Sequence, residues 1–524
     1  MQAQPQLLIF GIDGAPFGLT EWMMRRNLLP NLAAFKNDAG MAPLISTWPP
    51  HTAPAWPTIF NGRMPGEHGI YMFWDCQAAD YRLRTMRRDE AGVDNIFDFL
   101  AHRGKTVGLQ NIPMFHPASG AESYQIGWPL EKTLHYIHPP RLVRELAGAG
   151  GLVRPDISCM YDGDPGYYRR AMAFIGQRGV NLRYLLKNHP VDVAAVVFTE
   201  LDRVGHHYWH GIDPSHPQFG SCSTPGAIID TYRTIDGLFG EAVALVGDDC
   251  AIAVVSDHGM GPGTTGVRIH HLLEKGGFLE FHDGKDRFVS RTVMDGLTDI
   301  TELHKAIRFQ NTLAYMPVPG SFALNINLHG RQELGIVSPA DKKAVLKEVS
   351  AFLTECRSLN GEPLFAGVID AGDIYGGRHR EKAPDLLLVP HDPACMLLGD
   401  CGGPCQEPSI QTGLHRMEGL FMLRSSRRTG FDNGGALGIE AVASLLLASM
   451  GIQDAGFPAL EGKDWRRNRA GGGLIPGTAW SEGPNAGNGY SYEEPTTPVL
   501  GGTAGHDEGE WLEIGERLRR MGYL

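Results

Sequence analysis

The sequence AIAVVSDHGM, at residues 251–260, decides the fold that we expect for this chain. A short apolar, β-branched run comes directly before Asp257 and His258. Such a run is typical of a strand that is buried on both faces, as in a parallel sheet. A charged pair is costly to bury unless it is paired or coordinated. The end of this strand is therefore a candidate functional site.

Two more apolar runs end in the same way. LLIFGID ends at Asp13, and AAVVFTELD ends at Asp202. Ligands of open α/β sheets bind outside the carboxyl ends of the strands. We therefore expect these distant carboxylates to lie close together in the folded chain.

Apolar runs and helical stretches alternate along the chain, which predicts βαβ units. Further strands are expected at 106–112 and 385–390. Helices are expected at 31–38, 169–188, 231–247, 341–359 and 438–452. The predicted fold is a doubly wound, mostly parallel α/β sheet flanked by helices.

The predicted domain organisation is one catalytic core with insertions and a tail. The core is expected to span residues 1–464, with segments at about 114–165 and 262–375 inserted as a cap that contributes to substrate binding. Residues 465–524 are rich in Gly and Pro and end in the short amphipathic stretch EWLEIGERLRRMGYL. We expect an extended tail there, with a short terminal helix.

Net charge limits the partners that we expect. The 47 basic and 59 acidic side chains give −12, which disfavours non-specific binding to nucleic acid or anionic membrane. An anionic substrate stays possible, because bound cations dominate the local field of a metal site. No apolar stretch approaches the ~20 residues of a spanning helix. The N-terminus has no basic leader, so we expect a cytoplasmic protein; the oligomeric state stays open.

Thr52 lies in the stretch STWPPHTAPAW. Pro49 and Pro50 favour an extended approach, and Pro54 is tolerated only in the first turn of a helix. Thr52 therefore falls where a helix begins, beside free backbone donors and a dipole that favours an anion. The alternatives are a nucleophile and an ordinary helix N-cap.

The motif Asp202-Arg-Val-Gly-His206 is a candidate cation site. If a helix begins where the strand ends, residues four apart share one face, and Gly205 leaves room for a close approach. The following HHYWH could equally form a partly exposed aromatic surface. His415, in QTGLHRMEG, would by itself be read as a loop histidine. Taken together, three carboxylates, three imidazoles and one alcohol suit two divalent cations and a nucleophile.

This ordered series resembles the alkaline phosphatase superfamily, and within it the type I phosphodiesterase/nucleotide pyrophosphatase family. The matching segments are FGIDGA (10–15), TAPAWPTIFNGRMPGEHGI (52–70), TELDRVGHHYW (199–209), SDHGMGP (256–262), APDLLLVP (383–390) and GLHRMEGLF (413–421). The resemblance implies a bimetallic hydrolase of phosphate esters.

The resemblance also implies a role for each residue. Asp13, Asp257 and His258 would hold one metal beside Thr52, and a second metal would be held by Asp202, His206 and His415. Zinc is the usual metal of the family, and manganese or iron are alternatives. Thr52 would attack phosphorus and form a phospho-threonine intermediate, which water then hydrolyses.

One position departs from the family pattern. Nucleotide pyrophosphatases carry an asparagine soon after the HGI segment, where this chain has Phe73. Phe73, Tyr71 and Trp74 could wall a pocket for the leaving group, but core packing explains them equally well. The expected substrate is a small phosphate ester. The alternatives are transfer of a phosphoryl, phosphonate or sulfuryl group to an acceptor other than water, and a non-catalytic metal-binding scaffold.

Overall fold

The computed structural model describes residues 4–87, 91, 94–115, 119, 120, 122–128, 137–151, 166–282, 304–318, 320–399, 404–427, 429, 431 and 435–452. The predicted tail at 465–524 lies outside the described residues. So do residues 453–464 and much of the first predicted insertion.

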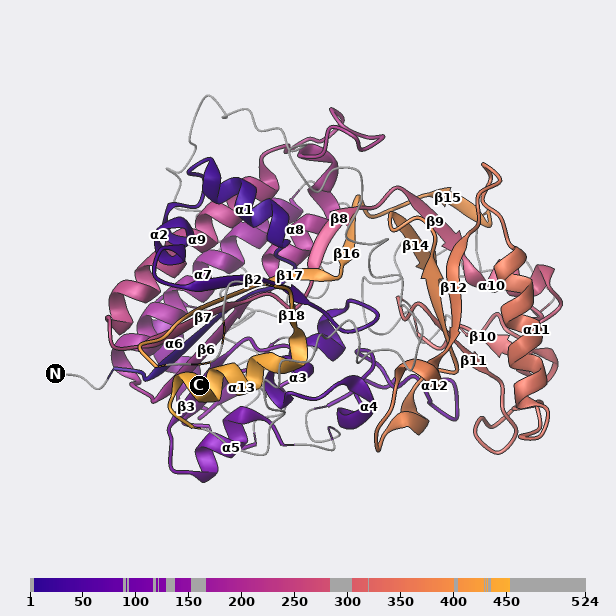
Figure 1. Ribbon diagram of the computed structural model, residues 1–524, viewed down its shortest axis with the longest axis horizontal. Coiled ribbons are helices and arrows are strands. Elements are labelled where there is room, and N and C mark those ends of the chain that lie inside the picture. The colour runs from indigo at the N-terminus through magenta and orange to yellow at the C-terminus, as the bar shows by residue number, and fades with distance from the viewer. Residues whose placement is uncertain are drawn as a thin grey trace.

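Nine described strands form one central sheet (Figure 1). In spatial order they are β18 (Leu437–Gly438), β2 (Gly40–Ile45), β17 (Glu418–Arg424), β7 (Ala251–Val255), β1 (Leu7–Ile12), β6 (Val193–Phe198), β3 (Val107–Gln110), β4 (Tyr124–Ile126) and β5 (Ile137–His138). The run from β7 to β4 is parallel, whereas β17 and β5 pair antiparallel with their neighbours. This confirms the prediction of a mostly parallel sheet.

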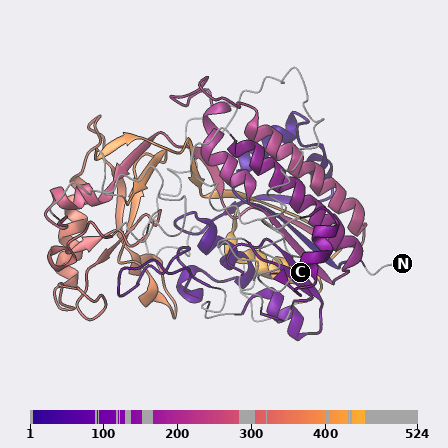
Figure 2. The same ribbon diagram turned by 180° about the vertical axis from the view of Figure 1, so that it is seen from behind.

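Helices cover both faces of the sheet, as the two views show (Figures 1 and 2). One face is covered by α1 (Phe17–Arg25), α2 (Pro30–Lys36), α6 (Leu142–Gly148), α7 (Tyr167–Asn188), α8 (Glu200–Tyr208) and α9 (Ala227–Val246). The other face is covered by α3 (Thr52–Asn61), α5 (Ile96–His102) and α13 (Val442–Ser449). A short helix, α4 (Pro65–His68), follows α3. The fold is therefore doubly wound, as predicted.

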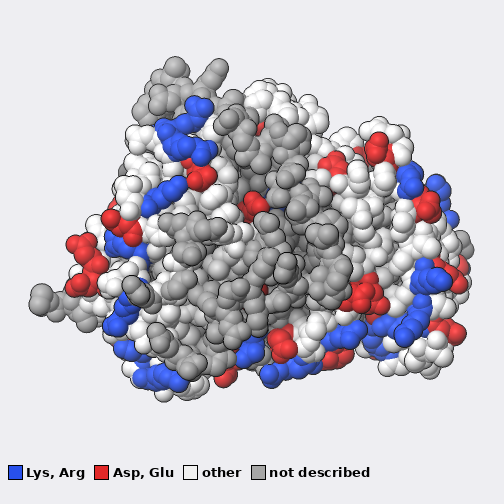
Figure 3. All heavy atoms as spheres, viewed as in Figure 1, with Lys and Arg blue, Asp and Glu red and all other residues white. Residues whose placement is uncertain are grey.

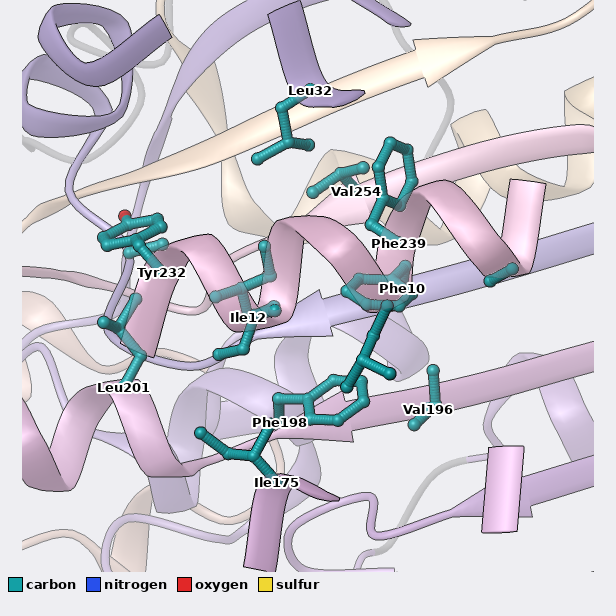
Figure 4. Close-up of a cluster of buried hydrophobic side chains, with 14 of the residues drawn as sticks. Phe10, Ile12, Leu32, Ile175, Val196, Phe198, Leu201, Tyr232, Phe239 and Val254 are labelled. Carbon is teal, nitrogen blue, oxygen red and sulfur yellow. The ribbon is translucent and has the colours of Figure 1, made fainter. Parts of the chain in front are cut away.

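Successive side chains of β1 point to opposite faces of the sheet and pack into the core layer on each side. Leu8, Phe10 and Ile12 pack on the α9 side, and Leu7 and Ile9 pack on the α3 side. In Figure 4 the Phe10 ring lies between Phe198 and Phe239, with ring centroids 5.2 Å from each. Burial of each such side chain stabilises the fold by about 1.5–3 kcal/mol. The sheet is thus a rigid platform for the loops at its edge.

A second region lies beside the core, at the right of Figure 1. Its strands form a sheet in the order β10 (Ala314–Tyr315), β11 (Ala323–Ile326), β13 (Leu386–Pro390), β12 (Phe365–Asp370), and another in the order β14 (Cys395–Leu398), β9 (Thr265–Arg268), β15 (Gln406–Pro408). Its helices are α10 (Ile269–Lys275), α11 (Lys342–Glu355) and α12 (Ala371–Ile374). Short 3₁₀ turns occur in this region at Phe309–Asn311 and Arg380–Lys382, and in the core at Trp209–Gly211 and Ile439–Ala441.

Several predicted elements are corrected by this arrangement. The run at 385–390 is a strand, but it belongs to the second region, where it pairs antiparallel with β11 and β12. The prediction that it joins the parallel sheet was wrong, because apolarity does not show which sheet buries a strand. The helix expected at 341–359 ends at Glu355, since Cys356 is extended. Parts of the segment at 114–165 join the central sheet as β4 and β5.

The boundaries of the predicted domains stay predictions. Because β13, β14 and β15 complete the small sheets, we propose that the second inserted region continues past residue 375 to about 408. The antiparallel pair of β8 (Gly259–Pro262) and β16 (Gly413–Arg416) lies where the chain leaves the core for this region and returns from it. Within the described residues, no helix has both the length and the apolar character to cross a bilayer.

Candidate metal and nucleophile site

Three neighbouring parallel strands end at the candidate site. Asp13 follows β1, and Asp257 and His258 follow β7. Asp202 lies in the first turn of α8, which begins just after β6. Since β7, β1 and β6 are adjacent in the sheet, their ends lie at one edge. The structure thereby brings together the carboxylates that were expected to converge.

Thr52 is the first residue of α3, as the sequence predicted. The cap of this helix is His51, whose Nδ1 accepts a hydrogen bond from Ala53 N–H at 3.1 Å. Interpretation of Thr52 as the N-cap is therefore wrong. Its hydroxyl instead faces the site: Oγ1 lies 3.4 Å from Asp13 Oδ1 and 3.2 Å from His258 Nε2.

Trp56, one turn into α3, fixes the first carboxylate. Its Nε1–H donates to Asp13 Oδ2 at 3.0 Å. The indole reaches this position because residue 11 is glycine: a Cβ there would lie 2.7 Å from the Trp56 ring. The helix that carries Thr52 is thus tied directly to the strand that carries Asp13.

The second predicted ligand set comes from α8 and β16. Asp202 and His206 share one face of α8, four residues apart, with His206 Nε2 3.4 Å from Asp202 Oδ1. His415 lies in β16, so its interpretation as a loop histidine is wrong. Its Nε2 is 3.0 Å from Asp202 Oδ1 and 3.0 Å from His206 Nε2. Ligands about 2.0 Å from a tetrahedral zinc are separated by about 3.3 Å, which matches these spacings.

Backbone carbonyls orient the three imidazoles. Nδ1 of His206 faces Gly413 O at 2.7 Å, Nδ1 of His258 faces Gly259 O at 3.0 Å, and Nδ1 of His415 faces Pro50 O at 2.9 Å. A carbonyl accepts only, so each Nδ1 carries the proton and each Nε2 of a neutral ring presents a lone pair. Backbone contacts of this kind commonly orient metal-binding histidines.

The carboxylates of the first set are buried with incomplete hydrogen bonding. Ligand atoms of Asp13, Asp257 and His258 lie within 4.8 Å of one another. Gly14 N–H donates to Asp257 Oδ1 at 3.3 Å, whereas Asp257 Oδ2 has no hydrogen-bond donor in the described part of the chain. His258 also groups with Asp202 and His415 within the same limit, so it lies between the two predicted sets.

Burial and mutual repulsion perturb the pKa values of this cluster. Burial, with the Asp257 and Asp202 charges, raises the pKa of Asp13 well above its usual range. Burial likewise raises the pKa of Asp257. Burial opposes ionisation of Asp202, but the neighbouring His206 and His415 outweigh it and hold the pKa of Asp202 very low. Among the described residues, none of the three carboxylates pairs with a lysine or arginine.

Exposure identifies the open side of the site. Asp13, Asp257 and His258 are at most 1% exposed and Thr52 is 5% exposed. His51 and His415 are half-buried. The ring of Phe73 contacts the ring of His51, with centroids 4.9 Å apart. The partly exposed His51 and His415 therefore lie on the solvent side of the site, with the buried Phe73 packed against His51.

The predicted aromatic wall is largely a packing cluster. Tyr71, Phe73 and Trp74 are all buried in one core cluster between α3 and the second region. The Tyr71 hydroxyl donates to His379 O, and its ring contacts Tyr375. Of the three, Phe73 is the one with a ring contact to His51, which precedes Thr52.

Sequence reasoning missed two residues of this neighbourhood, His51 and Trp56. Both lie next to Thr52, in a stretch that was already assigned to the start of a helix. A histidine directly before a candidate nucleophile was the available signal for His51. The Trp56 contact had no sequence signal, because it depends on how α3 packs over β1.

Comparison with known proteins agrees with this geometry. Residues 7–403 match the family described as type I phosphodiesterase/nucleotide pyrophosphatase. The chain belongs to this family. Membership in the type I phosphodiesterase/nucleotide pyrophosphatase family places the protein in the alkaline phosphatase superfamily and makes it a hydrolase of phosphoryl groups. His415 lies beyond the matched residues, so its place in the site rests on the structure.

Solved structures of similar proteins show the same fold. Phosphonoacetate hydrolase from Sinorhizobium meliloti 1021, in complex with phosphonoformate, has a TM-score of 0.53 at 14% identity, covering 85% of this chain and 96% of that one. Murine ectonucleotide pyrophosphatase/phosphodiesterase 5 has a TM-score of 0.50 at 12% identity, covering 86% and 95%. None of the curated proteins compared matches the chain.

Proposed function

We propose that this member of the type I phosphodiesterase/nucleotide pyrophosphatase family hydrolyses small phosphate esters, with Thr52 as the nucleophile and two divalent cations as cofactors. The observation that carries the proposal is the convergence of imidazole Nε2 atoms and carboxylate oxygens. His206 Nε2 and His415 Nε2 lie 3.0 Å apart, although both Nδ1 atoms face carbonyls. Two lone pairs repel at this distance unless a proton or cation lies between them.

The donor set fits a pair of cations. Asp13, Asp257 and His258 would hold one beside Thr52, and Asp202, His206 and His415 would hold the other. Mixed imidazole and carboxylate ligation favours zinc, with manganese or iron as alternatives. Three carboxylates offset three of the four charges of two dications, which leaves net positive charge for a phosphoryl group.

When bound, such cations would lower the pKa of an alcohol or water and stabilise a leaving oxygen. The chain supplies the remaining parts. Thr52 Oγ1 attacks phosphorus, forming an O–P bond as the bond to the leaving oxygen breaks, and the proton that Thr52 loses is matched by the proton that the departing alcohol gains. Water then attacks the phospho-threonine and releases Thr52 with its proton. Two in-line displacements give net retention of configuration at phosphorus.

The start of α3 supports this reaction. Thr52 N–H makes no hydrogen bond within the described residues, because the first residue of a helix has no intrahelical acceptor and His51 caps the next amide instead. A free amide at a helix N-terminus is suited to bind an anionic oxygen. The nucleophile and one donor for the transferring group therefore come from the same residue.

Replacement of the nucleophile tests the proposal. Zinc-loaded wild type should hydrolyse an aryl phosphate monoester, an aryl diester or an aryl phosphonate in a colorimetric panel, and Thr52→Ala should lose at least roughly 10³-fold in turnover. Elemental analysis should find the same metal content in both proteins. Thr58→Ala, a buried threonine in the same helix, is the matched control and should stay active. Near-normal turnover by Thr52→Ala would contradict the assignment.

A further inference from the structure

The ring of His51 is held in one orientation by contacts on several sides. Nδ1 accepts the Ala53 N–H at 3.1 Å, the Phe73 ring lies 4.9 Å away at 68°, and the His415 ring lies 5.7 Å away at 64°. Trp128 stacks on Phe73 at 5.3 Å, which supports that contact from behind. An aromatic column thus runs from the core to the site and fixes an imidazole beside Thr52.

The cap contact also fixes the tautomer of His51. A ring nitrogen that accepts a hydrogen bond carries no proton, so the proton of a neutral His51 is on Nε2. This nitrogen is on the edge of the ring away from the amide that His51 caps. His51 is therefore a neutral N–H donor with a fixed direction.

The position of His51 suits a substrate contact better than a purely structural role. His51 directly precedes Thr52 in the chain, and it is half-buried while Thr52 is 5% exposed. A capping residue needs only its acceptor atom. Capping does not require the aromatic column or the partial exposure of the ring. Both features are expected of an imidazole that contacts a bound substrate.

We propose that His51 Nε2–H donates a hydrogen bond to a non-bridging oxygen of the phosphoryl group that Thr52 attacks. This deepens the proposed function and rests on it. His51 would orient the phosphoryl group without adding charge, while the free Thr52 N–H binds another oxygen of the same group. His51 is then a substrate-binding residue for the transferred phosphoryl group.

Two substitutions separate this role from helix capping. Serine is a stronger N-cap than alanine, so His51→Ser keeps the backbone contact and removes the distant donor, whereas His51→Ala removes both. His51→Ala should melt several degrees below His51→Ser, and both should bind as much zinc as wild type. Despite its restored stability, His51→Ser should show kcat/KM reduced roughly 10- to 100-fold, like His51→Ala.

Binding of inorganic phosphate, measured by calorimetry on the zinc-loaded proteins, gives a readout that does not depend on turnover. Phosphate affinity should fall about tenfold in His51→Ser. Wild-type kinetics and phosphate affinity in that variant would overturn the role of His51 and leave the proposed function intact. If wild type binds phosphate through His51 but hydrolyses no ester, the proposed function fails and the donor role stands.

Discussion

At His206, His258 and His415, the nitrogen that faces the backbone determines what the other nitrogen can do. Each Nδ1 donates to a carbonyl, so each Nε2 is available as a ligand. The sequence identified all three residues, but it could not give their tautomers. The carbonyls of Gly413 and Pro50 are distant in sequence from the histidines that they orient. A residue type can therefore be recognised before its protonation is known.

Another histidine, His68, has the opposite arrangement and a structural role. It is fully buried, its Nδ1 accepts Ile70 N–H, and its Nε2 lies 3.0 Å from Thr58 Oγ1. Burial, with a smaller effect of His379, lowers its pKa from 6.5 to about 3. Between these values the unfolded chain binds a proton that the folded chain does not, so stability falls as pH falls.

Urea unfolding between pH 7 and pH 5 should reveal this loss. His68 should contribute about 2 kcal/mol of acid destabilisation over that range. His68→Gln should be less stable at pH 7, because it loses the fitted contacts, but its stability should fall less steeply with pH. Parallel pH profiles for the two proteins would show that His68 does not titrate as proposed.

At the scale of elements, the site depends on close contact between α8 and β16. A Cβ at Gly413 would lie 2.2 Å from Gly205 O in α8, and Gly413 O accepts from His206 Nδ1. The two backbones lie too close for a side chain at residue 413. If they moved apart, the hydrogen bond between His206 Nδ1 and Gly413 O would be lost. The sequence showed Gly205 as a position that leaves room near the site, but it did not show that the Met260 side chain of β8 fills that room or that β16 needs its own glycine at 413.

Substitution of Gly413 tests this contact. Gly413→Ala should force β16 away from α8, lower the unfolding free energy by about 2 kcal/mol or more, and reduce metal content by displacing His206 and His415. Calorimetric melting and elemental analysis would measure both effects. Gly176→Ala is the control, since Gly176 lies in α7 and a Cβ added there would meet nothing within 4 Å. That variant should gain about 0.5–1 kcal/mol.

At the scale of the whole molecule, Lys and Arg side chains lie among Asp and Glu side chains along the margins of the view in Figure 3, and the net charge of the chain is −12. Three of the acidic groups in that count, Asp13, Asp202 and Asp257, lie together in the buried site without a lysine or arginine partner among the described residues. Cations bound there would stabilise the folded state, because the unfolded chain does not assemble the site.

Removal of metal should therefore destabilise the entire core. Chelated protein should melt several degrees lower than zinc-loaded protein, since ligand at 100 times its dissociation constant contributes about 2.7 kcal/mol. Added zinc should restore both the melting temperature and the activity, whereas magnesium should restore neither fully. An unchanged melting temperature after verified metal removal would contradict a buried two-cation site.

Much of this architecture could be predicted from local pattern. Apolar runs before Asp13, Asp202 and Asp257 identified the three strands, because a strand buried on both faces must be apolar throughout. The proline spacing around Thr52 identified the start of α3. The run at 385–390 was assigned to the wrong sheet, since its apolar residues are equally suited to either one.

By itself, the sequence determined the strands, the helix starts and the types of residue at the site, because these depend on side chains near one another in the chain. The tertiary structure alone decided how His51 caps α3, how Trp56 holds Asp13, and which carbonyls orient the three imidazoles. The His51 cap and the His258 carbonyl contact are local, but the Trp56, His206 and His415 contacts join residues 43 to 365 positions apart. The geometry of these long-range contacts is set by packing between elements, which no local pattern encodes.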